Sequence, residues 1–173
     1  MNRLQYIVPI LLIIILGACN SAKELQESSA ENKALDTELI ARTLESERYI
    51  IKVNRHYSRG GFFIDVNSSI NFIAVNQNRV RVNLAYVGRS YEINPIAGIN
   101  FSGQLVDKSV STTKKGNVKI DMKVKKENDI FSIKLTILSN GKCDISIGHP
   151  KIDFSRYSGK VYQLEGSALE AVR

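Results

Sequence analysis

Residues 118–147 read VKIDMKVKKENDIFSIKLTILSNGKCDISI, and this stretch decides the fold class. Apolar and polar residues alternate along it in three runs, a pattern typical of strands with one buried and one solvated face. The runs are joined only by KEND at 126–129 and by the short link around Asn140-Gly141. The Asn-Gly pair predicts a hairpin with a type I′ turn, in which both central residues have positive φ. Links this short make the strands antiparallel neighbours.

The same alternation begins at Tyr49 and continues toward the C-terminus, most clearly over 79–86. Weaker strands are predicted at 49–54, 62–66, 70–75, 98–105, 152–154 and 160–164. We see no internal repeat and no alternation of strands with helices. The predicted fold class is therefore mainly β, an antiparallel meander curled into a sandwich or open barrel, with one N-terminal helix.

The segment 34–49, ALDTELIARTLESERY, has a different period. Its apolar side chains recur at helical spacing, which predicts an amphipathic helix with one packing stripe. The predicted stripe consists of Leu35, Leu39, Ile40, Thr43 and Leu44. The other side of this helix has mixed charge, so we expect the stripe to pack on the β structure rather than on a membrane.

The N-terminus looks like an export signal. Arg3 precedes an uncharged apolar run over 6–18. A membrane-spanning helix needs about 20 apolar residues, whereas a secretory signal needs only ~7–15 before small residues. The sequence Leu16-Gly17-Ala18-Cys19 resembles the bacterial lipobox. We therefore predict that Cys19 carries diacylglyceryl and palmitate chains, since one acyl chain alone binds a membrane only marginally.

These features predict three parts of the chain. Residues 1–18 are the lipoprotein signal peptide, 19–33 are the lipidated cysteine with a flexible polar tether, and 34–168 form a single domain. Asn20 follows the cysteine where an aspartate would signal inner-membrane retention. The predicted location is therefore the cell envelope, as an outer-membrane lipoprotein that faces the periplasm.

The net charge is +7, and removal of residues 1–18 leaves 23 basic and 17 acidic residues, or +6. The basic residues are scattered between apolar ones, as in Arg79-Val80-Arg81, which is typical of a solvated strand face. We therefore expect no nucleic-acid partner, despite the basic balance. The partners that we expect are the membrane, through the anchor, and a small amphiphile, a glycan or an envelope protein.

The residues that carry metal or acid–base chemistry are few. His56 and His149 are the two histidines, neither lies at a metal-ligand spacing, and both adjoin turn-like residues. We expect exposed loop histidines, no metal, no cofactor and no catalytic residue, because nucleophile and phosphate-loop motifs are also missing. Cys143 shares a strand face with Ile145 and Ile147, which predicts a buried, inert thiol.

Two segments combine glycine, tyrosine and arginine: LAYVGRSYEINP at 84–95 and FSRYSGKVY at 154–162. One interpretation is a shared aromatic and basic binding surface, since tyrosine and arginine both bind through flat, polar-tipped side chains. The alternative is structural, with glycines at bends and tyrosines covering one end of the β structure. The candidate surface consists of Tyr86, Arg89, Tyr91, Arg156 and Tyr157.

These same segments resemble the family called domain of unknown function 4251, found in lipoproteins of Gram-negative bacteria. The resemblance is carried, in order over 34–165, by LIARTLESERYIIKVNRHY, LAYVGRSY, GINFSG, the Asn-Gly hairpin and SRYSGKVYQLE. Ala85 departs from the family, which typically has proline there. The resemblance implies an exported, lipid-anchored antiparallel β domain with an N-terminal helix. It implies no activity, so no catalytic residue can be carried over.

The leading hypothesis is a non-enzymatic binding module of the envelope. The alternatives are an envelope hydrolase with unrecognised acidic residues and a structural accessory subunit of an envelope complex. A deep apolar pocket would favour binding of a small ligand, and a flat apolar patch would favour a protein partner. Two acidic side chains that face each other would favour hydrolysis.

Overall fold

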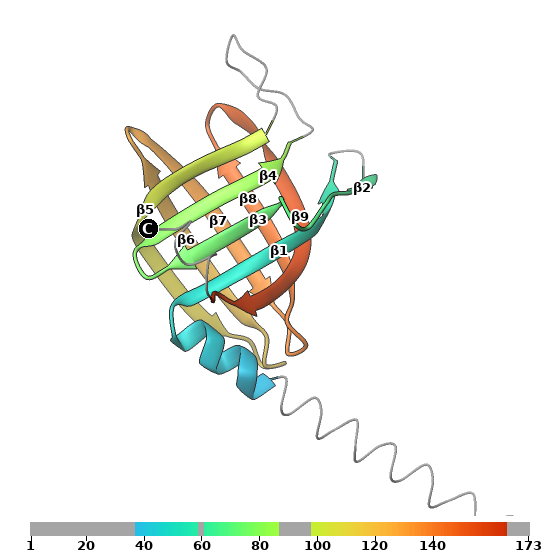
Figure 1. The fold of residues 1–173 in the computed structure, drawn as a ribbon, viewed down its shortest axis with the longest axis vertical. Coiled ribbons are helices and arrows are strands. Elements are labelled where there is room, and N and C mark those ends of the chain that lie inside the picture. Colours follow the sequence, from blue (N-terminus) through green and yellow to red (C-terminus); the bar gives the residue numbers. More distant parts are fainter. Residues whose placement is uncertain (1–36, 59–60, 87–97, 166–173) are drawn as a thin grey trace, which may run out of the picture. The chain divides into compact units, whose positions relative to one another are not determined.

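The computed structural model describes residues 37–58, 61–86 and 98–165. Nine strands, together with a helix over 37–45, make up this part of the chain (Figure 1). The strands are β1 Arg48–Tyr57, β2 Phe63–Asp65, β3 Phe72–Asn76, β4 Arg79–Ala85, β5 Gly98–Thr112, β6 Val118–Lys126, β7 Asp129–Ile137, β8 Lys142–His149 and β9 Ile152–Gln163.

All strand pairs are antiparallel, and the predicted mainly β meander is confirmed. Each strand from β3 onward pairs with the next one in the sequence. The sheet closes because β9 also pairs with β1, so the result is a closed barrel (Figure 1). Only β2 stays outside the closed ring, attached to the second half of β1.

The barrel interior is the hydrophobic core. Alternate residues of each strand point inward and are almost completely buried, as the period of two requires. An eight-stranded barrel is just wide enough for side chains to fill it, and here they do. On three successive strands the core residues are Ile120, Met122 and Val124, then Ile133, Leu135 and Ile137, then Cys143, Ile145 and Ile147.

This core lies within one compact unit, Thr37–Arg173, which is distinct from residues 1–36. A closed ring of strands with its own filled interior satisfies its backbone hydrogen bonds and buries its apolar faces internally. The unit therefore has what it needs to fold without the N-terminal residues.

The helix ends at residue 45, before the end of the predicted segment 34–49, and fewer of its side chains than predicted pack on the barrel. Thr43 is buried, and Ile40 and Leu44 pack against the barrel core. The prediction for Leu39 was wrong, because its side chain is 59% exposed. Three residues at helical spacing already cover the contact with the barrel, and Leu39 lies beside that stripe. Leu35 lies outside the described residues. Within those residues, no helix has the length and apolar character to cross a membrane.

Two strands are longer than the alternation predicted. The segments predicted at 152–154 and 160–164 belong to one strand, β9, and β5 continues past residue 105 to Thr112. In β5 the register with β6 shifts between Leu105 and Asp107, so the inward and outward positions change phase there. The alternation of apolar and polar residues in the sequence breaks at such a β-bulge, although the strand itself continues.

The hairpin at Asn140-Gly141 is confirmed, but its turn type differs from the prediction. Gly141 has φ +77°, whereas Asn140 does not have positive φ. The Leu138 amide donates to the Lys142 carbonyl at 2.8 Å, and the Gly141 amide donates to the Leu138 carbonyl at 2.9 Å. This pattern is typical of a longer hairpin loop with a left-handed glycine before the second strand, where only that glycine needs positive φ.

Closure between β1 and β9 requires a bulge and a glycine. The register shifts between Val53 and Arg55, so Asn54 is an extra residue in β1. Opposite this bulge lies Gly159, where a Cβ atom would stand 2.3 Å from the Lys52 carbonyl oxygen. Both partners in that approach are backbone atoms, so neither can rotate away. Glycine is therefore required at this position of β9.

We predict that Gly159→Ala destabilises the fold by about 1–3 kcal/mol, the range for overpacking a tightly packed site. Gly148→Ala is the matched control, because its Cβ would meet only the Phe154 ring at 3.6 Å. Urea unfolding of the two variants measures the difference. Equal unfolding midpoints would contradict the requirement for glycine at 159.

Cys143 is confirmed as a buried, free thiol. Burial raises the pKa of this thiol, and the nearby Asp144 carboxylate adds to the effect, so the reactive thiolate is suppressed. We predict that a bulky maleimide leaves Cys143 unmodified in the folded protein and modifies it in guanidinium chloride. Ser132→Cys, on the exposed face of β7, should react quickly in the folded state. Modification of Cys143 at the rate of that control, measured by mass spectrometry, would contradict its burial.

Candidate functional site

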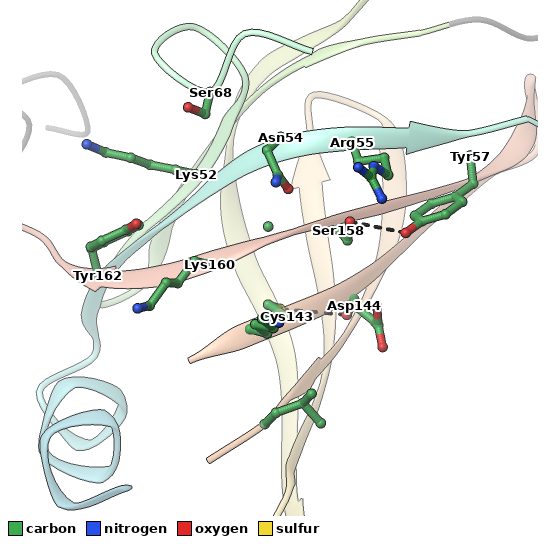
Figure 2. A pocket seen from close by; sticks show the side chains of 13 residues that line it. Lys52, Asn54, Arg55, Tyr57, Ser68, Cys143, Asp144, Ser158, Lys160 and Tyr162 are labelled. Carbon is green, nitrogen blue, oxygen red and sulfur yellow. Dashed lines mark hydrogen bonds between the residues drawn. The ribbon is translucent and has the colours of Figure 1, made fainter. Parts of the chain in front are cut away.

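A groove of about 550 Å³ lies on the outer face of the barrel. It crosses β8, β9 and β1, with Ser68 also at its border (Figure 2), and Leu138 is another of its lining residues. Most of the side chains that line it point outward, because the inward positions of the same strands belong to the core, and the buried Cys143 also borders it. The site is therefore a groove on the surface of the barrel.

Three lysines form a row across this groove. The strand register places Lys142 of β8 opposite Lys160 of β9, and Lys160 opposite Lys52 of β1. Adjacent strands lie about 4.8 Å apart, so the row spans roughly 10 Å. We call it the lysine row. All three residues are exposed and line the groove, and Figure 2 shows Lys52 and Lys160.

The lysine row is not compensated by acids in the part of the chain that the structure describes. No carboxylate there lies within ion-pair distance of any of the three ammonium groups; Lys52 Nζ instead lies 5.2 Å from the centre of the Tyr162 ring. Like charges directly opposite each other destabilise a sheet. The row therefore costs folding free energy unless an anion binds between the ammonium groups.

The next row of outward residues is more balanced. It contains Asp144, Ser158 and Arg55, and on β2 Asp65. Arg55 Nε donates to Asp65 Oδ1 at 2.9 Å, so this guanidinium is already paired. The hydroxyls of Ser158 and Tyr57 share a hydrogen bond of 3.3 Å. This row supplies hydroxyl groups and one unpaired acid, Asp144, to the end of the groove away from the lysines.

A third row is aromatic and basic. It runs from Arg156 to Tyr57 and on to Phe63 of β2. The Arg156 guanidinium lies 5.8 Å from the centre of the Tyr57 ring, and the Arg55 guanidinium lies 4.1 Å from that of Phe63. The Tyr57 and Phe63 rings meet edge to face at 6.5 Å. These side-chain contacts add to the backbone pairing that holds β2 beside the second half of β1.

The residues of the predicted binding surface are divided between two sides of the sheet. The Tyr157 hydroxyl donates to the Ala85 carbonyl at 3.0 Å, and the Asp153 amide donates to the Tyr86 hydroxyl at 3.0 Å. The segments around the two tyrosines therefore meet, as predicted, but both tyrosines are buried inside the barrel. Burial also raises the pKa of Tyr157, which keeps its hydroxyl protonated as a donor.

The other members of that predicted surface lie elsewhere. Arg156 points outward from β9, next to Tyr57, and does not accompany the neighbouring Tyr157 into the interior. This separation follows from the period of two, since consecutive strand residues face opposite sides. Arg89 and Tyr91 lie outside the described residues, so their part in a binding surface stays a prediction.

The expectation that both histidines are exposed in loops was wrong, because both lie in strands. His56 is 1% exposed and packs against the Tyr157 ring, with centroids 4.7 Å apart. Burial lowers the pKa of His56, which keeps the imidazole neutral at pH 7. The turn-like residues that follow His56 in the sequence lie after the end of β1, so they wrongly indicated that the histidine itself lies in a loop.

The His149 side chain contacts an aromatic ring, a backbone amide and a carboxylate. Its ring stacks on Phe131 at 4.3 Å, and Phe131 stacks on Phe101 at 4.1 Å. Nδ1 accepts the Lys151 amide at 3.3 Å, and Nε2 lies 3.5 Å from Asp129 Oδ1. Both ring nitrogens thus have neighbours, so this histidine is poorly placed to take a proton from a substrate. These residues line a second, smaller hollow of about 230 Å³.

The described residues offer little for metal or acid–base chemistry. No group of three histidine, cysteine or acidic side chains among them is arranged to hold a metal ion. Glycoside hydrolysis needs two facing carboxyl groups. Among the described lining residues, the groove has one carboxylate, Asp144, and the smaller hollow has one, Asp129. The chemistry that the groove does offer is attraction of negative charge.

The lysine row was not found from the sequence. Its members are far apart in the chain, and each one looks like an ordinary solvated strand residue. Only the pairing of β1 with β9 and of β8 with β9 aligns them.

Comparison with known proteins identifies the family. The family model described as a domain of unknown function, DUF4251, matches residues 31–161. The fold is similar to the crystal structure of a DUF4251 family protein from Bacteroides eggerthii DSM 20697, with a TM-score of 0.66. The sequences are 22% identical, and the match covers 80% of this chain and 95% of that one. None of the curated proteins matches. Since the family model spans most of its length, the chain belongs to the DUF4251 family.

Proposed function

We propose that the protein is a non-enzymatic binding module of the cell envelope that holds an anionic ligand in the outer groove. The observation that carries this proposal is the lysine row, three ammonium groups on adjacent strands with no carboxylate paired to them in the described part of the chain. The ligand class is a small molecule or glycan with phosphate or carboxylate groups.

The physical reason is electrostatic. Lysine ammonium groups act as point charges toward phosphate and carboxylate, and several of them within about 10 Å reinforce one another. A bound anion replaces repulsion inside the row by attraction. Hydroxyls of Tyr57, Ser158 and Tyr162 line the same groove and supply neutral hydrogen-bond donors. Hydroxyls next to cations also suit a sugar or a phosphorylated head group.

The filled interior supports a surface site over an internal one. Barrels that carry a ligand inside have a cavity there. Here the inward side chains of the described strands pack together, with exposures between 0% and 7% for the core cluster. A ligand that bound inside would have to displace these core residues. The groove outside needs no such rearrangement.

The cellular part of the proposal rests on the sequence. Cys19 lies outside the described residues, and it follows the apolar run and the small residues Gly17 and Ala18. We propose that its lipid attaches the domain to the outer membrane on the periplasmic side. The polar tether 19–33 then gives the groove access to ligands near that membrane.

We predict that Lys160→Glu weakens anion binding at least tenfold, because it removes the central charge of the row and adds a repulsive one. Isothermal titration of residues 20–173 with pyrophosphate and with trigalacturonate measures this and separates phosphate from carboxylate ligands. Lys119→Glu on β6 makes the same charge change on an exposed strand residue away from the groove and should bind like the parent. Lys119→Glu should melt near the parent temperature, and Lys160→Glu at or above it, because the substitution replaces repulsion within the row by attraction. Parent-like binding by Lys160→Glu would contradict the proposal.

For the anchor, we predict that Cys19→Ala abolishes incorporation of labelled palmitate and leaves an unprocessed precursor. The reason is that the thiol is the acceptor of the diacylglyceryl group in a lipobox. Metabolic labelling followed by immunoprecipitation gives the readout. Cys143→Ala is the matched control and should be labelled normally. Unchanged labelling of Cys19→Ala would exclude this attachment site.

A further inference from the structure

The outer face that carries the lysine row continues into a band of exposed aromatic side chains. Phe63 of β2 is 54% exposed and stands in the row with Tyr57 and Arg156. Phe154 is 61% exposed and lies two residues before Arg156 on the same face of β9. Large apolar side chains that cluster on one exposed face are typical of interaction surfaces.

The distance between the two features is set by the strands. Lys52 pairs with Lys160, and Tyr57 pairs with Arg156 four residues away on β9, so the lysine row and the aromatic band lie about 13 Å apart at the usual rise per residue. Both are on the outward side of the sheet because the bulge at Asn54 keeps Lys52, Arg55 and Tyr57 on one face. We call this surface the lysine–aromatic face, defined by Lys52, Lys142, Lys160, Phe63 and Phe154.

Strand β2 is what extends this face. After Lys52, β3 no longer pairs with β1, and β2 takes its place beside Arg55 to Tyr57. Asn71 fixes the exchange: its carbonyl accepts the Val53 amide at 2.8 Å. Within the described residues, β2 pairs only with β1, so it stands out beside the barrel as a lip (Figure 1). The residue before it, Phe62, is 78% exposed.

The lysines and aromatic rings on this face match the two layers of an anionic membrane surface. Lysines near a surface attract anionic lipid head groups by about 1 kcal/mol each. Aromatic side chains prefer the boundary between head groups and acyl chains, where apolar rings leave water. On β9, Arg156 lies between Lys160 and Phe154, and Tyr57 stands beside Phe63; arginine and tyrosine both suit this boundary. The same face thus offers ammonium groups to lipid phosphates and aromatic rings to the boundary between head groups and acyl chains.

We propose that the lysine–aromatic face docks on an anionic phospholipid bilayer, with the lysine row against phosphate groups and Phe63 and Phe154 inserted at the interface. This inference rests on the proposed function, because it names lipid head groups as the anions that the row binds. Charge complementarity favours the bilayer over a second copy of the chain, since two copies joined through this face would bring their lysine rows together. A partner strand would find only the three-residue edge of β2.

The test uses residues 20–173, which contain the whole barrel unit and lack the acylated cysteine. Co-sedimentation compares vesicles of phosphatidylglycerol and phosphatidylcholine with vesicles of phosphatidylcholine alone. We expect binding only to the anionic vesicles. Phe154→Ser and Phe63→Ser should each lower the partition coefficient about tenfold. Lys160→Glu should lower it at least tenfold.

Matched controls come from β6 and β7, two strands that carry no residue of the lysine–aromatic face. Ile130→Ser replaces a half-exposed apolar residue of β7, and Lys119→Glu changes an exposed lysine of β6; both should bind vesicles like the parent. Phe63 contacts Arg55 and Tyr57, so its loss affects the lip, whereas Phe154 has an exposed ring on an established strand. Melting curves of each variant verify that the barrel is intact.

The outcomes separate the two proposals. Loss of vesicle binding in Phe154→Ser, with pyrophosphate binding unchanged, supports membrane docking. Pyrophosphate binding by the parent without vesicle binding overturns membrane docking and leaves the groove function in place. Absence of both overturns both. Light scattering gives the remaining outcome. If the parent protein is a dimer and Phe154→Ser is a monomer, the face is an interface between two copies of the chain, and membrane docking is overturned.

Discussion

The hydrogen bonds between β1 and β9 join the first and last strands of the barrel, which come from opposite ends of the domain sequence. From β3 to β9, neighbours in the barrel are also neighbours in the chain, so those pairs can form as local hairpins, and only β2 separates β1 from β3 in the sequence. The β1–β9 pairing alone has to close a long loop, whose entropy must be offset by the core that closure completes. It succeeds because Gly159 lets the two backbones approach at the bulge.

The same closure creates the candidate site. Lys52 lies on one of the two strands and Lys160 on the other, and Lys142 joins them from β8. Before closure these residues are ordinary solvated lysines, and after it they stand side by side. The Tyr57–Ser158 hydrogen bond and the contact of Arg156 with Tyr57 also cross this seam. The seam of the barrel and the candidate groove are therefore the same region, and the repulsion within the lysine row acts against the pairing that closes the barrel.

The sequence predicted the strands well because period two reflects burial directly. It placed Cys143 with Ile145 and Ile147 on an inward face, and the structure agrees. It could not predict the β1–β9 register, which depends on a bulge at Asn54 that no local pattern announces. The lysine row was missed for that reason. The histidines were misjudged because neighbouring turn residues hide the fact that a strand end can still point inward.

The predicted binding surface shows the same limit. Tyr86 and Tyr157 do come together, which their similar settings in the sequence suggested, yet they do so as hydrogen-bonded core residues. Arg156 belongs to the outer face, with Tyr57 as its neighbour. Sequence similarity between two segments can thus indicate that they meet. It does not indicate on which side of a sheet each side chain lies.

The filled interior has a consequence for kinetics. A ligand of an internal cavity must wait for a portal to open, whereas a groove on the outer wall is accessible at all times. For the anionic ligand that we propose, capture would be limited by diffusion and orientation, and an excess of positive charge would accelerate it toward the order of 10⁸ M⁻¹s⁻¹ at low ionic strength. Release would be correspondingly rapid, because no closed structure would hold the ligand in place. Such a site is suited to frequent, short encounters whose duration changes with the salt concentration of the surrounding medium.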